Sequence, residues 1–229
     1  MSLAVRAEHL TERMDDPECS EAVLRRTYER FGLVNRAVAC WGVVYRTLIR
    51  PELAALERAG RPARILDIGC GAGDVLLRLV AAARRDGFAV DGVGIDPDAS
   101  AIAATRPAEH VRFREAFSRD LVDAGERFDV VVSNHVLHHL GDEERRGFLA
   151  DSELLASGRS LHSDIRRSPA AYRAYALASP LVAAGTFIRV DGLRSIRRSF
   201  TVPELRDVLP GGWRAEAAAP HRVLAIRDA

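Results

Sequence analysis

The sequence predicts an α/β fold in which a mostly parallel sheet is covered by helices on both faces. Short apolar runs alternate with segments whose apolar residues recur every three or four positions, the pattern of strands followed by helices. The first apolar run leads directly into alternating glycines, at Gly69, Gly71 and Gly73. Two further runs, at 212–220 and 221–228, close the chain and are expected to form an antiparallel pair.

Residues 19–60 are expected to be helical until Gly60 and Pro62 stop the pattern. The core then alternates strands with helices. Its strands are expected at 63–69, 89–96, 110–117 and 128–137, and its helices at 73–87, 98–106 and 142–157.

The pattern changes after a weak fifth strand at 159–165. An alanine-rich helical stretch at 168–185 is longer than a plain crossover and is interpreted as an insertion, and a short helix at 200–209 follows it. With the closing pair, the sheet has seven expected strands. We interpret the chain as one domain, with an N-terminal helical arm or lid (1–60), a ligand-binding core (61–165) and substrate-side helices with the closing strands (166–229).

Composition excludes several classes of protein. The 229 residues carry a net charge of +1, which gives no reason to expect nucleic acid as a partner. All 33 basic residues are arginine, so no lysine chemistry is available. Cys19, Cys40 and Cys70 form neither a disulfide framework nor a metal-ligand pattern. No apolar signal core or run of about 20 apolar residues occurs, so we expect a cytoplasmic protein without a membrane span.

The residues of the glycine turn limit the classes of ligand that can bind there. A P-loop requires a lysine that the chain does not have, and a dinucleotide site requires a third glycine where Asp74 stands. A carboxylate there repels a pyrophosphate. Together with Asp67 ahead of the glycines, it favours a ligand with a cationic end.

Three stretches resemble motifs of the class I S-adenosylmethionine-dependent methyltransferases. They are "LDIGCGAGD" at 66–74, "VGIDPDA" at 93–99 and "FDVVVSNHVLHHL" at 128–140. The resemblance implies a Rossmann-like seven-stranded sheet with S-adenosylmethionine as the cofactor. It further implies a set of cofactor-binding residues: Asp67, Gly69, Cys70, Gly71 and Gly73 for the methionine end, Asp96 and Pro97 for the ribose, and Asn134 and His135 lining the cofactor.

The third strand departs from the family pattern. In "VRFREAFSRDL" (111–121), Ala116 and Phe117 stand where the family commonly has Gly-Asp next to the adenine. We therefore expect Phe117 to stack on the adenine and Ser118 to make polar contacts with it. The alternative is that Phe117 points into the core.

The arm, "RTYERFGLVNRAVACWGVVYR", is similar to that of the ubiquinone/menaquinone-type methyltransferases and would lie over the cofactor. Its candidate residues are Tyr28, Asn35, Trp41, Tyr45 and Arg46, with Arg46 expected to pair with the cofactor carboxylate. The alternative is ordinary helix packing. "DIRRS" and "RSIRRSFT" are similar to segments of small methyltransferases beside polyketide and quinone-type pathways.

A sulfonium methyl is already activated, so transfer requires positioning and, for a phenol or enol, removal of a proton. His139 or His138 is the expected base, with His162 in reserve, because all three follow strands at the ligand-binding edge. The alternative is a packing role for each. No metal is expected, because no ligand spacing such as HExxH is present.

We therefore expect a methyltransferase that modifies an oxygen or ring carbon of a small apolar or aromatic acceptor, such as a phenolic polyketide or quinone precursor. The alternative is a non-catalytic S-adenosylmethionine-binding regulatory or scaffold protein. The helical insertion either covers the acceptor or is a helix pair that packs in the core or forms a homodimer contact. Methylation of protein or nucleic acid is disfavoured, because the charge is neutral and "SNHV" differs from the "NPPY" type found in base-modifying relatives.

Overall fold

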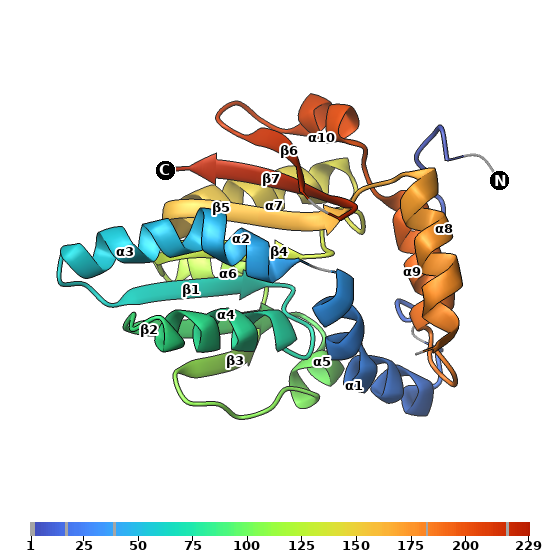
Figure 1. Cartoon of the computed structure of the whole chain (residues 1–229), viewed down its shortest axis with the longest axis horizontal. Coiled ribbons are helices and arrows are strands. Elements are labelled where there is room, and N and C mark those ends of the chain that lie inside the picture. Colours follow the sequence, from blue (N-terminus) through green and yellow to red (C-terminus); the bar gives the residue numbers. More distant parts are fainter. Residues whose placement is uncertain (1–2, 17, 39, 182, 219) are drawn as a thin grey trace.

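A computed structural model describes residues 3–16, 18–38, 40–181, 183–218 and 220–229, with residues 31–38 described by their backbone fold alone. Within these residues, seven strands form one sheet in the order β3-β2-β1-β4-β5-β7-β6 (Figure 1). The first five pair in parallel, and β7 runs antiparallel to both of its neighbours. The strands are β1 (Ala63–Ile68), β2 (Val90–Asp96), β3 (Val111–Glu115), β4 (Phe128–Asn134), β5 (Ala156–Ile165), β6 (Arg214–Ala218) and β7 (Arg222–Asp228).

Helices cover both faces of the sheet, which confirms the predicted fold class. On one face, α2 (Trp41–Val44), α3 (Arg50–Arg58) and α4 (Asp74–Arg85) bury their apolar side chains against the strands. On the other face, α6 (Ser118–Asp123), α7 (Asp142–Leu155) and α10 (Val202–Val208) do the same. Burial of these two apolar layers holds the strands in register, because a one-residue slip exchanges the faces.

The expectation of one continuous helix at 19–60 is wrong. Helix α1 (Glu21–Val38) ends before Cys40, whose φ of 52° places it in the left-handed region. The chain then turns into α2, a π-helical turn η1 (Tyr45–Ile49) and α3. This break separates α1, at the carboxyl ends of the strands, from the two helices that pack on the sheet (Figure 1).

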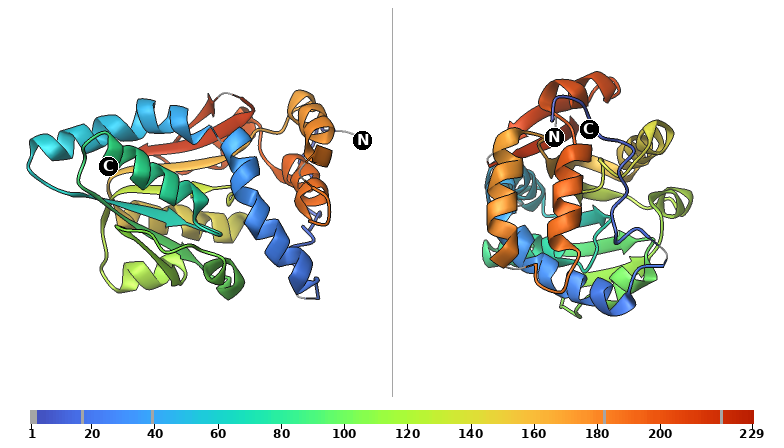
Figure 2. Two further views of the ribbon diagram at one scale, coloured as in Figure 1. Left: turned by 60° about the horizontal axis from the view of Figure 1, so that its bottom comes forward. Right: turned by 90° about the vertical axis from the view of Figure 1, so that its right-hand side faces the viewer.

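Three helices cap the carboxyl ends of the parallel strands: α1, α8 (Pro169–Ala178) and α9 (Ile188–Arg198) (Figure 2). Helices α8 and α9 approach closely at Gly192, where an added Cβ would lie 2.2 Å from the hydroxyl oxygen of Tyr175. That hydroxyl donates a 2.7 Å hydrogen bond to the carbonyl of Ile188. The predicted helical stretch at 168–185 thus holds α8 and the short η2 (Ser179–Leu181), whereas α9 had no separate prediction.

The N-terminal segment, residues 3–16, lies against α9 rather than in solvent. The amide of Ala7 donates to the carbonyl of Arg197 at 3.0 Å, and the Arg194 guanidinium donates to the carbonyl of Thr11 at 2.7 Å. No pattern in the sequence indicates these contacts between residues 3–16 and α9.

The bounds of other helices and strands differ from the expected bounds by a few residues. Helix α7 stops at Leu155 and β5 starts at once with Ala156, so the fifth strand is longer than expected. The short helices α5 (Ala99–Ala103) and α6 follow β2 and β3. No helix in the described ranges is long and apolar enough to cross a membrane.

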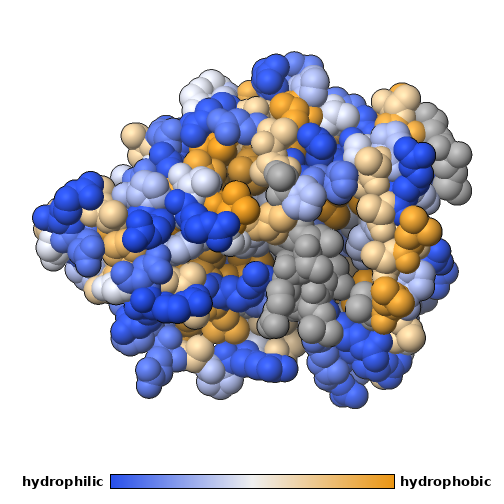
Figure 3. All heavy atoms as spheres, in the orientation of Figure 1, coloured by the Kyte–Doolittle hydropathy of each residue, from blue (hydrophilic) through white to orange (hydrophobic). Residues whose placement is uncertain are grey.

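The outer face of α8 and η2 carries exposed apolar side chains (Figure 3). Leu177 is 81% exposed and Leu181 is 88% exposed. A homodimer through the helical insertion remains a prediction.

Candidate active site

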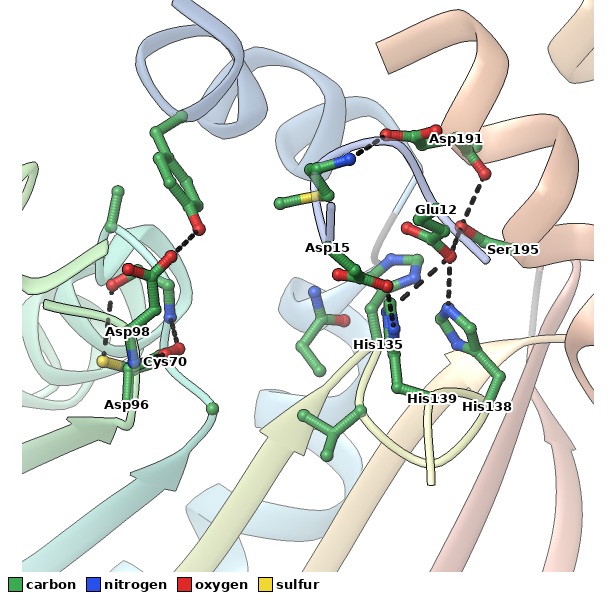
Figure 4. Close-up of a pocket in the computed structure, with 18 of the residues that line it drawn as sticks. Glu12, Asp15, Cys70, Asp96, Asp98, His135, His138, His139, Asp191 and Ser195 are labelled. Carbon is green, nitrogen blue, oxygen red and sulfur yellow. Dashed lines mark hydrogen bonds and ion pairs between the residues drawn. The ribbon is translucent and has the colours of Figure 1, made fainter. Parts of the chain in front are cut away.

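A cavity of about 700 Å³ opens at the carboxyl ends of the parallel strands. It lies where β1 and β4 are neighbours and the strand order changes direction, the usual ligand position in open α/β sheets. Its lining falls into two groups on opposite sides (Figure 4). One group comes from the glycine turn and the end of β2, and the other from the segment after β4, the N-terminal segment and α9.

The glycine turn leaves its backbone open to the cavity. Gly69, Gly71 and Gly73 have φ values of 68°, 54° and 79°, which side chains other than glycine rarely adopt. An added Cβ would lie 2.6 Å from Val136 at Gly69 and 2.3 Å from Phe113 at Gly73, so these two glycines permit close packing. At Gly71 nothing lies within 4 Å, so this position is free for close approach of a ligand.

Asp67 is a buried carboxylate at the end of β1. Neither of its oxygens has a hydrogen-bond partner in the described part of the chain. Burial, followed by the nearby carboxylates of Asp74 and Asp96, raises the pKa of Asp67 well above its ordinary value. A cationic group in the cavity would offset this cost, so the site fits the α-ammonium group expected for the cofactor.

Asp96, at the end of β2, is held by two backbone amides. One oxygen accepts from Gly71 at 2.9 Å and the other from Asp98 at 3.0 Å. Asp98 in turn accepts a 2.6 Å hydrogen bond from the Tyr28 hydroxyl of α1. Cys70 and Pro97 complete this side. Asp98 was missed, although "VGIDPDA" contains it.

The residues expected at the adenine do not line the cavity. Phe117 is 65% exposed at the start of α6, so the alternative that it packs in the core is wrong. The Ser118 hydroxyl donates to Asp151 at 2.8 Å, and Ala116 packs against the core under α6 and α7. Contacts of Ala116, Phe117 and Ser118 with adenine remain a prediction.

The expectation for Arg46 is wrong. It lies on η1 and lines a second hollow on the α4 face, with Arg50, Arg78 and Arg85, away from the turn that holds Asp67. Its helix packs on the sheet face, so the side chain does not reach the cofactor side of the main cavity.

The other arm residues have packing or supporting contacts. The Trp41 indole donates to the Asn134 amide oxygen at 3.1 Å, and the Tyr45 hydroxyl donates to Asp86 at 2.9 Å. The side chain of Asn35 is outside the described residues.

A buried arginine supports the end of β4. The Arg222 guanidinium, from β7, donates to the Asn134 amide oxygen at 2.7 Å, to His135 Nε2 at 2.8 Å and to the Ser163 hydroxyl at 2.8 Å. His135 Nε2 is therefore an acceptor, and burial together with Arg222 lowers the pKa of His135. An arginine beginning the apolar run "RVLAIRD" was the only sequence signal for this role.

His138 is clamped between two buried carboxylates. Its Nδ1 lies 2.7 Å from Asp164 Oδ1, and its Nε2 lies 3.2 Å from Glu12 Oε1. Burial alone would lower the pKa of His138, but the two carboxylates outweigh it and raise the value to about 9. For Glu12, the same contacts outweigh burial and lower the pKa to about 2.

His139 lies beside His138 and is 30% exposed. Its Nε2 is 3.7 Å from Glu12 Oε1, and its Nδ1 is 3.3 Å from Asp15 Oδ2. Glu12 and Asp15 are held in place by α9. Asp191 accepts the amides of Arg13 and Met14 at 2.8 and 3.0 Å, and the Ser195 hydroxyl donates to Glu12 at 2.7 Å. Glu12, Asp15, Asp191 and Ser195 had no predicted role, because no local sequence pattern indicates that the N-terminal segment meets α9.

The expectation that His162 serves as a reserve base is wrong. The side chain is fully buried on the α7 face of β5, with the Trp213 ring stacked on it at 5.3 Å and the Phe148 ring tilted against it at 4.7 Å. Its Nδ1 hydrogen-bonds the Ser133 hydroxyl, and burial lowers its pKa to about 3. Alternation along β5 points His162 away from the cavity's histidines.

Comparisons with known proteins agree with this arrangement. Ubiquinone biosynthesis O-methyltransferase of Azorhizobium caulinodans is 39% identical over 87 residues, which cover 34% of this chain and 31% of that protein. Ribosomal protein L11 methyltransferase of Geobacter sulfurreducens is 40% identical over 82 residues, covering 36% and 26%. The chain thus spans less than a third of the length of these two curated relatives.

A solved structure shows the same fold over nearly the whole chain. Plantazolicin methyltransferase BpumL, in complex with a pentazolic desmethylPZN analog and SAH, gives a TM-score of 0.63 at 12% identity. The match covers 91% of this chain and 95% of that one. It confirms the Rossmann-like architecture predicted from the sequence.

A family model described as a methyltransferase domain matches residues 43–200. That range is more than half of the chain and contains the glycine turn, the end of β2 and the three histidines after β4. The resemblance seen in the sequence is confirmed, and this protein belongs to the methyltransferase domain family.

Proposed function

We propose that this protein transfers the methyl group of S-adenosylmethionine to an oxygen atom, or a ring carbon, of a small acceptor. The observation that carries the proposal is the buried, unpartnered carboxylate of Asp67 beside the open backbone at Gly71. This pair lines the same cavity as a set of proton-transfer groups, the carboxylates and histidines of the acceptor side. The alternative is a cofactor-binding protein that regulates or scaffolds a partner without transferring a methyl group.

The chain's own residues would hold the cofactor in three places. Asp67 would pair with the α-ammonium group, the turn at Gly69, Gly71 and Gly73 would let the methionine portion approach, and Asp96 would accept the ribose hydroxyls. The cofactor, when bound, supplies an electrophilic sulfonium methyl. Tyr28 and Asp98 would close this side from α1.

The acceptor side is more polar than the sequence suggested. Met14, Ile165 and Tyr175 give it apolar surface, but Glu12, Asp15 and the histidines share the same wall. It suits an acceptor with an apolar or aromatic body and a hydroxyl, such as a phenolic polyketide or quinone precursor. The ubiquinone O-methyltransferase relatives support this class of acceptor. A cytoplasmic location and a role in secondary metabolism remain predictions.

The acceptor proton would leave at the His138–His139 edge. His138 is not the proton acceptor, because its two nitrogens are taken by Asp164 and Glu12 and it is already protonated at neutral pH. In a metal-free site, His139 would therefore act as the base, with Asp15 stabilising the imidazolium that forms.

Calorimetry with S-adenosylhomocysteine tests the cofactor assignment, and a screen of phenolic acceptors with isotope-labelled S-adenosylmethionine tests transfer. We expect binding by the wild type, weaker binding by Asp96→Ala by a few kcal/mol, and unchanged binding by Asp91→Ala, an exposed aspartate on the same strand. Absence of binding by the wild type would refute the proposal. Binding without transfer to any acceptor would favour the regulatory alternative.

A further inference from the structure

Three side chains on the acceptor side, Glu12, His138 and His139, bring nitrogen and oxygen atoms close together (Figure 4). Glu12 Oε1 lies 3.2 Å from His138 Nε2 and 3.7 Å from His139 Nε2. The three donor atoms all lie within 4.8 Å of one another. They come from the N-terminal segment and from the turn after β4, so only the folded chain brings them together.

The two separations from Glu12 Oε1, 3.2 and 3.7 Å, are close to those between ligands around a single transition-metal ion. Two ligand atoms, each about 2.0–2.2 Å from a tetrahedral cation, are separated by roughly 3.3–3.6 Å. Hydrogen bonding accounts for the 3.2 Å contact between His138 Nε2 and Glu12 Oε1. It does not account for the approach of His139 Nε2 to the same oxygen, because 3.7 Å is too long for a hydrogen bond.

The groups behind the three donors are arranged as they are around metal ligands. Asp164 Oδ1 lies 2.7 Å from His138 Nδ1, and Asp15 Oδ2 lies 3.3 Å from His139 Nδ1. A carboxylate on the distal nitrogen fixes the tautomer of a histidine ligand and raises its basicity. The Ser195 hydroxyl donates to Glu12 and orients that carboxylate too.

A second set of donors, His135, His138 and Asp164, fits a metal less well. The Arg222 guanidinium already occupies His135 Nε2 at 2.8 Å and places a positive charge beside the set. Asp164 already accepts hydrogen bonds from His138 Nδ1 and from the amide of Ile165. Asp164 therefore holds the orientation of His138 through its Nδ1 and is not itself a ligand.

Local charge favours a divalent cation. Glu12 and Asp164 are buried, and Asp15 is partly exposed beside them. Arg198, 3.9 Å from Asp15, faces this group from α9, and His138 carries a positive charge only when no metal takes its nitrogen. A cation among the three carboxylates reduces their mutual repulsion.

We infer that Glu12, His138 and His139 form a binding site for a divalent transition-metal ion of the zinc type. Two nitrogens and one carboxylate oxygen suit Zn²⁺ or Co²⁺ better than Mg²⁺ or Ca²⁺, which prefer oxygen ligands. Three protein ligands leave a coordination position for an acceptor oxygen, as in catalytic zinc sites. This role rests on the proposed function, whereas metal binding does not.

The metal would select the acceptor. It favours an acceptor whose oxygen ionises on coordination, such as a phenol or an enol, because it lowers the pKa of that hydroxyl so that the proton passes to solvent water. His139 then acts as a ligand and not as a free base. This replaces the expectation that the site holds no metal.

The test uses the full chain after treatment with a chelator and dialysis. Co²⁺ is added first, because its visible absorption bands report tetrahedral nitrogen and oxygen ligands, and Zn²⁺ is then used to displace it with affinity measured by competition. We expect one ion per chain, with affinity reduced about 100-fold or more in Glu12→Gln and His139→Asn and about 10–100-fold in Asp15→Asn. Glu8→Gln, an exposed carboxylate in the same segment, and His110→Asn, an exposed histidine elsewhere, are the matched controls and should bind like the wild type.

Binding of S-adenosylhomocysteine and the melting temperature are measured on the same preparations to show that each variant is folded. Failure of the wild type to bind Co²⁺ or Zn²⁺ more tightly than Glu12→Gln and His139→Asn overturns the metal site. If S-adenosylhomocysteine still binds in that case, the proposed function stands and His139 is the base. If the metal binds and the cofactor does not, the metal site stands and the proposed function fails.

Discussion

Asp67 combines complete burial with the lack of any hydrogen-bond partner in the described chain, a costly arrangement for a carboxyl group. We expect Asp67→Asn to weaken S-adenosylhomocysteine binding by roughly 10–100-fold, because a charge-assisted contact with the ammonium group is lost. The free energy of unfolding should stay the same or rise, because the substitution removes a buried acidic group that lies near two other carboxylates. Calorimetry and urea unfolding measure the two effects, and Asp91→Asn is the control. A variant that loses stability and keeps its affinity would contradict this role for Asp67.

Burial of neutral His162 makes the stability of the folded protein depend on pH. Its pKa is about 3 in the folded protein and 6.5 in the unfolded chain, so the unfolded state holds more protons between these values. Stability should therefore fall as the pH drops from about 6.5 toward 3, by about 2 kcal/mol at pH 5 for this residue. Urea unfolding at pH 7 and pH 5 should show this loss reduced in His162→Phe and unchanged in His110→Phe. Equal pH dependence in the wild type and His162→Phe would exclude this origin.

At the scale of single residues, the sequence identified the cofactor side better than the acceptor side. Asp67, Gly71 and Asp96 belong to one continuous pattern of strand, turn and strand, so their spacing is read directly. Glu12 is 126 residues from His138, and no local pattern predicts their contact.

Between elements, the N-terminal segment is attached to α9 by the side chain of Asp191. The two backbone amides of Arg13 and Met14 donate to it, which sets the position of Glu12 and Asp15. We expect Asp191→Asn to weaken this attachment by about 2 kcal/mol, since two charge-assisted hydrogen bonds become weaker. Amide exchange in residues 10–16 should accelerate and the KM for the acceptor should rise, with cofactor affinity unchanged. Asp207→Asn, exposed on α10, is the control, and unchanged exchange in both variants would rule out this attachment.

The elements themselves were predicted with uneven success for physical reasons. Strands β1 and β4 are buried on both faces, which gives clear apolar runs. Strand β3 lies at the edge of the sheet and β5 is rich in polar residues, so their patterns are weaker. The break at Cys40 left no such signal, because apolar residues keep their helical spacing on both sides of it. Helix α9 is clearly amphipathic, with Ile188 and Ile196 buried and several arginines in its sequence, so this helix could have been predicted from the spacing of its apolar residues.

For the whole molecule, β7 links the antiparallel edge of the sheet to the end of β4. Arg222 on this strand is buried and donates to Asn134, His135 and Ser163. Arg222→Met should cost about 3 kcal/mol of unfolding free energy, because the acceptors are left buried and unpaired. Urea unfolding measures this cost. Arg227→Met, on the same strand and partly exposed, should cost far less, and equal losses in the two variants would count against the role of Arg222.

The sequence by itself determined the fold class, the glycine turn and the family, because each depends on local patterns that are only a few residues long. Periodicity and spacing are local properties of the sequence. Because a parallel sheet brings the ends of successive strands to one edge, residues at those strand ends are predicted to lie close together. The tertiary structure alone decided which histidine faces the cavity, where Arg46 lies and which carboxylates meet His138 and His139. These outcomes depend on the break at Cys40, on the antiparallel return of β7 and on the docking of residues 3–16 against α9. The last two are contacts between distant segments, fixed by packing and charge, and the break at Cys40 is a backbone turn that the spacing of apolar residues does not reveal.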